Sequence, residues 1–552
     1  MIWRILTIFA VVAVGLNSVP QDDTWRHLAL GRLFTEIGGL PKLEPFGIFV
    51  SDPRFIDYSW VSCWVFYWIH RLLDEPGLII ASALMFAFTL DLAVLPGEKG
   101  CKHTVVWWLT RALVLISVAF AVRWRITARP EVFGLFFFTL CCRLAASEYA
   151  SRWKWPFLAA IVVLWNNFHA TAGLVLGIWG LTMVGAVFQK NTVGIKRALL
   201  GLAIASAALF VNPWGWRLIR ESLMQGLLPI NQFIFEFQSL HFDTWFPFRA
   251  PLIFLCVGAT MYRGWRQKCF LGELPLLLGT LALSLKYSRC LPYIYLLTAK
   301  NLVMLTTEIL EPLLQGVRKK LTFAVLVLSC WGAYLCISFN EYYGNHFARL
   351  DYMRGIDLLV STKAGPEIFN DFAMGGYLMW AGGGRYKLYI DNRSPIYAKT
   401  TFPKYLQNSI LEVCKKELGA TSYDAIVLPA PRYCGPRHAL ESGICGTAPG
   451  CIEKKDWSLI YFSDSVLVYL RKREGLKADV DRYGFSWIDA VELRIPVIAA
   501  RMSQMLALPG AGAGIKAEID RALQMDPENS RAHAYLQIFT QLSAGVPPGN
   551  VH

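Results

Sequence analysis

The chain is poor in charged residues and lacks several common enzyme motifs. Charged residues make up 17% of its 552 positions, against roughly 25% in soluble domains. It contains no G-x-x-x-x-G-K-[ST] loop, no G-x-G-x-x-G, no H-E-x-x-H and no nucleophile-elbow motif. These absences count against ATP-driven transport and against zinc proteolysis.

Long apolar runs fill the first 340 residues, whereas the remainder has the composition of a soluble protein. Because a membrane-spanning helix needs roughly 20 apolar residues, the pattern predicts a polytopic α-helical membrane protein with about eleven transmembrane helices. The predicted spans lie near residues 3–20, 77–95, 105–122, 131–147, 156–170, 172–188, 197–211, 251–263, 270–287, 290–308 and 321–339.

The charges of the connecting loops give these spans a direction. With the N-terminus in the cytoplasm, every loop predicted inside is basic, such as the loop with Arg263, Arg266 and Lys268, as the positive-inside rule requires. The C-terminus is then outside. The net charge of +14 reflects this topology and lipid contact, so we expect no nucleic-acid partner. Residues 58–73 are rich in Trp and Tyr and predict a helix at the membrane interface, since a span there would invert every later loop.

Three domains are expected: a transmembrane domain (1–340), an extracytoplasmic α/β domain (341–475) and a helical tail (476–552). Short β-like runs at 386–391, 425–429 and 466–470 support the α/β domain. Residues 517–536 resemble one tetratricopeptide unit, which predicts a helical hairpin. Cys414, Cys434, Cys445 and Cys451 permit disulfides with three pairings. Zinc is disfavoured because no C-x-x-C pair is present.

The first predicted external loop opens with an acidic pair, Asp22 and Asp23. These carboxylates suit a general base, or an anchor for a metal or a phosphate-bearing substrate. The alternative is that they only favour the start of a helix. His27 follows about one helical turn later, on a similar face.

The second candidate set lies at the outer end of the third span and contains Arg123, Arg125, Arg129 and Glu131. Outside loops usually avoid arginines, and phosphate ligands favour them. Glu131 follows Pro130 and can simply favour the first turn of a helix.

Polar residues at the outer end of the fifth span form the third set. Asn167 and His169 lie at membrane depth, where polar side chains are costly and indicate function, although a lone histidine is as often structural. Arg289 is a further external candidate, with Asn212, Arg217 and Glu236. All three sets fall on the outer side of the predicted topology, so they can converge on one external cavity.

Residues 1–340 resemble the C-type glycosyltransferase superfamily, which includes protein O-mannosyltransferases, aminoarabinose transferases and oligosaccharyltransferases. The resemblance rests on one span followed by the acidic pair, on the interfacial helix, and on Ala128-Arg-Pro-Glu131 before an apolar helix. The chain is also similar to bacterial membrane proteins with a D-x-x-W-x-H-L-x-x-G opening, and residues 369–378 and 389–393 fit that group.

The resemblance implies transfer of a sugar from a polyprenyl-phosphate carrier to a glycan, lipid or protein acceptor. The protein would lie in a bacterial inner membrane, with its soluble domain in the periplasm. Asp22 or Asp23 would act as general base, Glu131 would be the second acid, and arginines would hold the lipid phosphate. A divalent cation, Mg or Mn, is an optional addition held by these three acids. A non-catalytic scaffold and a transporter of lipid-linked substrates are the alternatives.

Overall fold

The computed structural model describes most of the chain. The described residues are 2–16, 22–95, 104–147, 152–228, 231–232, 234–240, 246–313, 351–407, 411–420, 422–430, 451–492 and 495–545. They form two compact units. The first unit comprises Met1–Thr35 and Ile56–Ala348, and the second comprises Glu36–Phe55 and Arg349–His552. Residues 36–55, the middle of the first predicted external loop (21–76), therefore group with the second unit, although their sequence position suggested the first.

The first unit is a bundle of helices. They are α1 (Ile2–Gly15), α2 (Asp22–Glu36), α3 (Trp60–Ala93), α4 (Val105–Ala121), α5 (Glu131–Ala146), α6 (Lys154–Phe168), α7 (Leu174–Phe188), α8 (Thr192–Ala208), α9 (Trp216–Gln225), α10 (Phe246–Arg266), α11 (Phe270–Lys286) and α12 (Leu291–Leu313). Helices occupy every predicted span except 321–339, which lies outside the described residues. The apolar runs thus predicted the helices well.

Two helical stretches in the described part of the chain are long and apolar enough to cross a membrane. They are Trp60–Ala93 and Ala170–Phe188, while Ile2–Gly15 and Val105–Ala121 are apolar but shorter. The total of about eleven spans stays a prediction.

Helix α3 contains a break that separates two predicted elements. Asp74 has φ 53° and ψ −159°, and Pro76 follows it. The backbone thus leaves the helical region between the aromatic segment 58–73 and the predicted span 77–95. The two segments were expected to be separate helices, and this kink divides them as expected.

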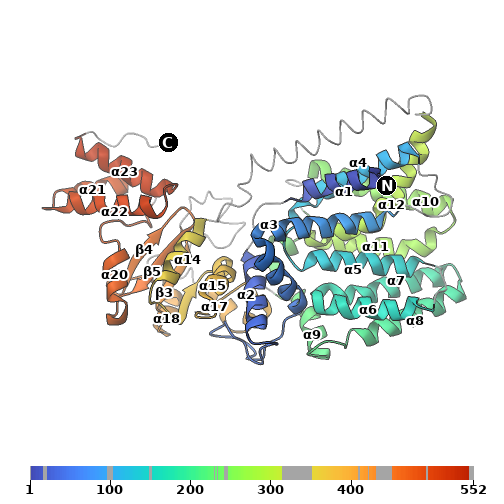
Figure 1. Ribbon diagram of the computed structural model, residues 1–552, viewed down its shortest axis with the longest axis horizontal. Coiled ribbons are helices and arrows are strands. Elements are labelled where there is room, and N and C mark those ends of the chain that lie inside the picture. The colour runs from blue at the N-terminus through green and yellow to red at the C-terminus, as the bar shows by residue number, and fades with distance from the viewer. Residues whose placement is uncertain are drawn as a thin grey trace. The chain divides into compact units, whose positions relative to one another are not determined.

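The core of the bundle lies around α5, which packs against α3, α6, α7 and α12. The helices α5, α6, α7 and α8 run side by side, and α2 runs at a steep angle to them near one end of the bundle (Figure 1). Large fully buried rings fill the interior, including Trp107, Trp165 and Trp179. Other large apolar side chains point outward, among them Phe9, Phe88 and Phe254.

The second unit contains a five-stranded sheet of order β2-β1-β3-β5-β4. The strands are β1 (Glu367–Asn370), β2 (Lys387–Leu388), β3 (Ala425–Pro429), β4 (Trp457–Phe462) and β5 (Val466–Arg471). β1 pairs in parallel with β2 and β3, whereas β5 pairs antiparallel with β3 and β4. The prediction of a C-terminal domain with a sheet is confirmed.

Helices surround this sheet and continue into the tail. They are α14 (Asp351–Ser361), α15 (Gly375–Gly382), α16 (Ser394–Tyr397), α17 (Thr401–Gln407), α18 (Leu411–Ala420), α20 (Lys477–Tyr483), α21 (Ile495–Leu506), α22 (Ala511–Met525) and α23 (Ser530–Ser543). α23 packs against both α21 and α22 (Figure 1), as the predicted hairpin requires, whereas its relation to tetratricopeptide repeats stays a prediction. A disulfide joins Cys414 of α18 to Cys451; Cys434 and Cys445 lie outside the described residues.

Candidate functional site

The candidate site lies where several helices of the first unit begin or end. α4 ends at Ala121 and a 3-10 turn, η1 (Arg123–Arg125), follows it. Pro130 then precedes α5 with φ −52°, a value already close to that of a helix. The hydroxyl of Thr24 in α2 donates to the carbonyl of Ala128 at 3.1 Å. The start of α2 and the turn before α5 are therefore held together.

Five charged side chains form what we call the ion cluster: Asp23, Arg125, Arg129, Glu131 and Glu236. Arg129 contacts Asp23 at 2.7 Å and Glu236 at 2.5 Å. Arg125 contacts Glu236 at 2.6 Å and also pairs with Glu131. The structure thus brings together acids and arginines from α2, η1, α5 and η4 (Phe235–Phe237). Two arginines bridge three carboxylates in one connected network.

Glu236 is ionised in this network. Burial alone would raise the pKa of its carboxyl group, but the arginines outweigh burial and hold that pKa well below the usual range of a glutamate. Burial lowers the pKa of Arg125 to about 10 despite its acidic partner, so this guanidinium is still charged at neutral pH. Arg125 and Glu236 are therefore a charged pair within the cluster, with the side chain of Arg125 only 1% exposed.

Arg289 lies beside the cluster and lacks an acidic partner within the described part of the chain. It sits in the 3-10 turn η5 (Ser288–Cys290), and its guanidinium stacks over the ring of Phe237 at 4.6 Å. Its charge lowers the pKa of Glu236, which places it within electrostatic reach. η5 is tied to η4 because the Ser288 hydroxyl donates to the Glu236 carbonyl at 3.2 Å. Arg289 is thus a half-buried cation beside the cluster.

His169 lies at the end of α6, close to the cluster. Its Nδ1 is 2.7 Å from the Thr171 hydroxyl, and the side chain is 6% exposed. Gly134 of α5 packs against the ring, since a Cβ there would be 2.6 Å from Nδ1. The absence of a side chain at Gly134 thus lets the imidazole approach α5.

Asn167 has a different position from the one expected for a substrate ligand. Its amide oxygen accepts from Nε1 of Trp60 at 2.9 Å. Its amide nitrogen donates to the carbonyls of Val163 and Val211. Because both ends of the amide are engaged, Asn167 ties α3, α6 and the end of the α8 region together. The structure does not place it as a free binding group.

His27 is also occupied. Its Nδ1 lies 3.1 Å from Sγ of Cys63, and its Nε2 lies 3.0 Å from Arg26. Burial and then the charges of Arg26 and Arg129 hold its pKa well below the usual range of a histidine. His27 is therefore a neutral packing residue between α2 and α3. The expected role in substrate binding does not fit this placement.

The remaining candidates are neighbours of cluster residues in the chain. Asp22 is the first residue of α2 and adjoins Asp23, and Arg123 begins η1 two residues before Arg125. Both acids of α2 stand in its first turn, where negative charge is favourable.

The arrangement does not suit a metal ion held by Asp22, Asp23 and Glu131. Glu131 faces Arg125, and Asp23 faces Arg129. Among the described residues no three potential ligands of the types His, Cys, Asp and Glu are grouped. Arginines thus stand against two of the three carboxylates that a cation would need.

The central position of Glu236 was not evident from the sequence. The sequence indicates only that Glu236 is one of several external polar residues, because the segment 212–250 carries no motif. Its partner Arg129 is 107 positions away in the chain. One signal could have pointed to Glu236. The predicted outer side carries an excess of arginines, and an acidic residue in a long segment on that side is a candidate partner for them.

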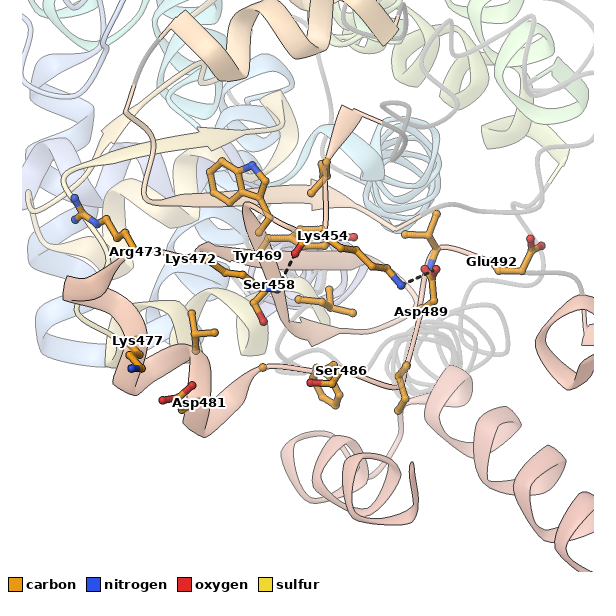
Figure 2. A pocket seen from close by; sticks show the side chains of 18 of the residues that line it. Lys454, Ser458, Tyr469, Lys472, Arg473, Lys477, Asp481, Ser486, Asp489 and Glu492 are labelled. Atoms are coloured by element: carbon orange, nitrogen blue, oxygen red, sulfur yellow. Dashed lines mark hydrogen bonds and ion pairs between the residues drawn. The ribbon is translucent and has the colours of Figure 1, made fainter. Parts of the chain in front are cut away.

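A separate cavity of about 1070 Å³ lies in the second unit. Figure 2 shows its lining, which combines the sheet residues Ser458 and Tyr469 with charged side chains. Asp489 at its rim pairs with Lys454 and Arg501, each at 3.3 Å. Its lining therefore mixes aromatic, hydroxyl and mutually paired charged groups.

The fold is similar to that of oligosaccharyltransferases. One such structure is the Archaeoglobus fulgidus oligosaccharyltransferase in complex with Zn and sulfate, with a TM-score of 0.51 at 10% identity over 99% of this chain and 84% of that chain. Another is the oligosaccharyltransferase AglB of the same organism in complex with an inhibitory peptide and a dolichol-phosphate, with a TM-score of 0.53 at 9% identity over 99% and 87%.

At these identities the likeness concerns the fold. No protein-family model matches the chain, and no curated protein matches its sequence. The similar structures agree with the expected superfamily, which includes oligosaccharyltransferases. The narrower expectation of an O-mannosyltransferase-like or aminoarabinose-transferase-like protein stays a prediction.

Proposed function

We propose that this protein is a membrane glycosyltransferase that moves a sugar from a polyprenyl-phosphate carrier to an acceptor outside the cytoplasm. The observation that carries the proposal is the ion cluster with Arg289 beside it. Three acids and three arginines from separate segments meet at one place in a bundle whose fold is similar to that of oligosaccharyltransferases.

The apolar outer surface of the first unit supports a membrane location. Phe9, Phe88 and Phe254 are each more than half exposed, and exposed apolar surface on this scale marks contact with lipid or with another protein. The basic inner loops and the two long apolar helices agree with this. A similar structure holds a dolichol-phosphate, and a lipid carrier of that kind requires a site at the membrane surface.

The chemistry assigns a separate task to each group. The acceptor oxygen or nitrogen bonds to the anomeric carbon of the sugar while the bond from that carbon to the phosphate oxygen breaks. The acceptor proton passes to the carboxylate of Asp22 or Asp23. The electron pair of the broken bond stays on the lipid phosphate, where Arg289 stabilises the added charge. Asp23 is oriented for this role by Arg129.

The ion cluster acts as a rigid support for these groups. Arg129 contacts both Asp23 and Glu236, so the first turn of α2 is linked to η4. Asp23, Glu131 and Glu236 together neutralise Arg125 and Arg129. Arg289 is then the cation assigned to the phosphate. The second unit would supply acceptor recognition, and the mixed lining of its cavity suits a polar acceptor such as a peptide or a glycan.

The test is donor turnover by the purified full chain. Polyprenyl-phosphate sugars are supplied, and release of the lipid phosphate is measured for wild type, Asp22→Asn, Asp23→Asn and Arg289→Ala. We expect one of the two Asp variants to lose at least about a hundredfold in kcat. We expect Arg289→Ala to raise KM and lower kcat, with Arg289→Lys intermediate. Turnover that is equal in all five proteins would refute the assignment.

A further inference from the structure

The first external loop is built into the second unit through a buried ionic contact. Glu44 pairs with Arg393 at 2.7 Å, and the two side chains are 4% and 8% exposed. Arg393 also contacts the carboxylate of Asp391 at 2.6 Å, and the Tyr397 hydroxyl donates to the same carboxylate at 2.7 Å. We call Glu44, Asp391, Arg393 and Tyr397 the clasp.

The charges of the clasp are all satisfied. Burial would raise the pKa of Asp391, but Arg393 and the hydrogen bonds outweigh burial and lower it. The other carboxylate oxygen of Glu44 also has a partner, because Oε1 accepts a hydrogen bond from the backbone N–H of Phe46 at 2.8 Å. A buried arginine between two carboxylates is costly to expose, since removing one partner leaves an uncompensated charge.

Backbone hydrogen bonds extend the clasp along the loop. Leu388 of β2 donates to the carbonyl of Phe46 at 2.7 Å, and Ile48 donates to the carbonyl of Leu388 at 3.0 Å. Farther along, Ser51 donates to the carbonyl of Ile396 at 2.7 Å. The loop therefore continues the sheet beyond β2, with Gly47 bridged in parallel to Leu388.

Gly47 makes this close approach feasible. A Cβ at this position would lie 2.9 Å from the Tyr397 hydroxyl and 2.5 Å from Val50. Only a residue without a side chain fits between the loop and the clasp. Loop and clasp are thus fitted to each other at three levels: charge, backbone pairing and sterics.

The chain on either side of the loop leads directly to the proposed catalytic elements. α2, which begins with Asp22 and Asp23, ends at Glu36, and α3 begins at Trp60. Glu44 follows Glu36 by eight positions, and a chain of that length spans at most about 28 Å. A loop fixed at the clasp therefore leaves α2 only a short free connection.

We propose that Glu44 and Arg393 are positioning residues, whose clasp on the first loop restrains the end of α2 and so holds the Asp22–Asp23 pair in its reactive place. The kinetic part of this inference rests on the proposed function, and its structural part does not.

The experiment compares Glu44→Gln with a matched control in the same unit. Glu518 is also a buried glutamate, 7% exposed, and it accepts from the backbone N–H groups of Ser486, Trp487 and Ile488. Glu518→Gln is therefore the same chemical change away from the loop. Hydrogen exchange is measured by mass spectrometry on the full chains, and donor turnover is measured in parallel.

In Glu44→Gln we expect exchange across residues 43–55 to become roughly tenfold to a hundredfold faster. Exchange at the C-terminal end of α2 should also rise, and residues 457–471 should not change. We expect kcat to fall roughly tenfold to a hundredfold with KM for the donor unchanged, and Glu44→Asp to recover part of it. In Glu518→Gln the faster exchange should be confined to residues near 486–488, with exchange in residues 43–55 and in α2 unchanged.

The outcomes separate the clasp from the proposed function. Unchanged exchange in the loop or in α2 would overturn the clasp, as would equally faster exchange there in Glu518→Gln or an unaltered kcat in Glu44→Gln. If the wild type turns over no donor while the loop and α2 both loosen in Glu44→Gln, the restraint on α2 stands and the proposed function fails.

Discussion

Glu236→Gln is the sharpest test of the ion cluster. Glu236 contacts Arg125 at 2.6 Å and Arg129 at 2.5 Å, and Arg125 is almost entirely buried. Removing the carboxylate leaves a buried guanidinium with less compensation, which typically costs 3–5 kcal/mol. The Glu236 side chain is 22% exposed, so water offsets part of the loss and we expect about 3 kcal/mol.

The assay is thermal unfolding of the purified full chain, followed through tryptophan fluorescence. With roughly 300 residues in the first unit and an unfolding entropy of roughly 2.1 cal/mol/K per residue, 3 kcal/mol corresponds to a fall in Tm of about 5 °C. Glu221→Gln, a partly exposed glutamate of α9, is the control and should change Tm by less than about 1 °C.

The pH dependence of the Tm difference tests whether the carboxylate of Glu236 is ionised in the folded protein. The folded pKa of Glu236 is held well below the usual range, so its contribution is complete above the unfolded pKa of about 4.3. It is lost as the pH falls through that value toward the folded pKa. The gap in Tm between wild type and Glu236→Gln should therefore be full at pH 7 and shrink below about pH 4.5. A gap that is absent at pH 7, or equally large at pH 2, would refute the ionised cluster.

Three further predictions follow from other contacts. Gly134→Ala should cost about 1–3 kcal/mol and impair donor turnover because its Cβ would meet the ring of His169, whereas Gly258→Ala, with open space around it, should be neutral; equal effects would contradict the close packing. Reduction of Cys414–Cys451, 37 residues apart, should destabilise the second unit by about 4 kcal/mol, seen as a lower Tm in dithiothreitol, and a Tm that does not respond would contradict the linkage. Donor turnover should be unchanged within about twofold by EDTA or by added Mn, because arginines already neutralise the acids; loss of activity in EDTA would show that a metal enters the site.

The helices were predictable because each needs only local information. Apolar runs such as Glu131–Ala146 are long enough to define a helix by composition, and Pro130 marks where this one begins. The break at Asp74 is also local, since Pro76 follows it. The sequence could not count the membrane spans, because length and composition single out only two of the described helical stretches.

The sheet was predictable in part. β3 and β5 were expected within a residue of their observed bounds, whereas β1 (Glu367–Asn370) and β4 (Trp457–Phe462) were missed. β1 has only four residues and begins and ends with polar ones, so no alternation is visible. β4 is buried on both faces and thus shows no period that separates it from other apolar runs.

The candidate site was predictable as a set of residues but not as a set of contacts. Asp23, Arg125 and Arg129 were selected because charge is unusual where they occur. Their partner Glu236 and the loop residue Glu44 depend on residues more than a hundred positions away. His27 and Asn167 looked functional for the same reason as the others, but hydrogen bonds to neighbouring helices account for them. A polar side chain at membrane depth indicates an important residue, but it does not show whether the role of that residue is structural or catalytic.

The central claim is that the lipid phosphate binds beside the ion cluster. A polyprenyl-phosphate analogue with a photoreactive group near the phosphate tests this directly when the full chain is irradiated and the labelled peptides are identified. The account predicts labels in residues 22–36, 123–131 and 288–295, lost when unlabelled polyprenyl phosphate is added and in Arg289→Ala. Labels concentrated at another charged group of the bundle, such as the one where Glu308 pairs with Arg263 and Arg266, would contradict it.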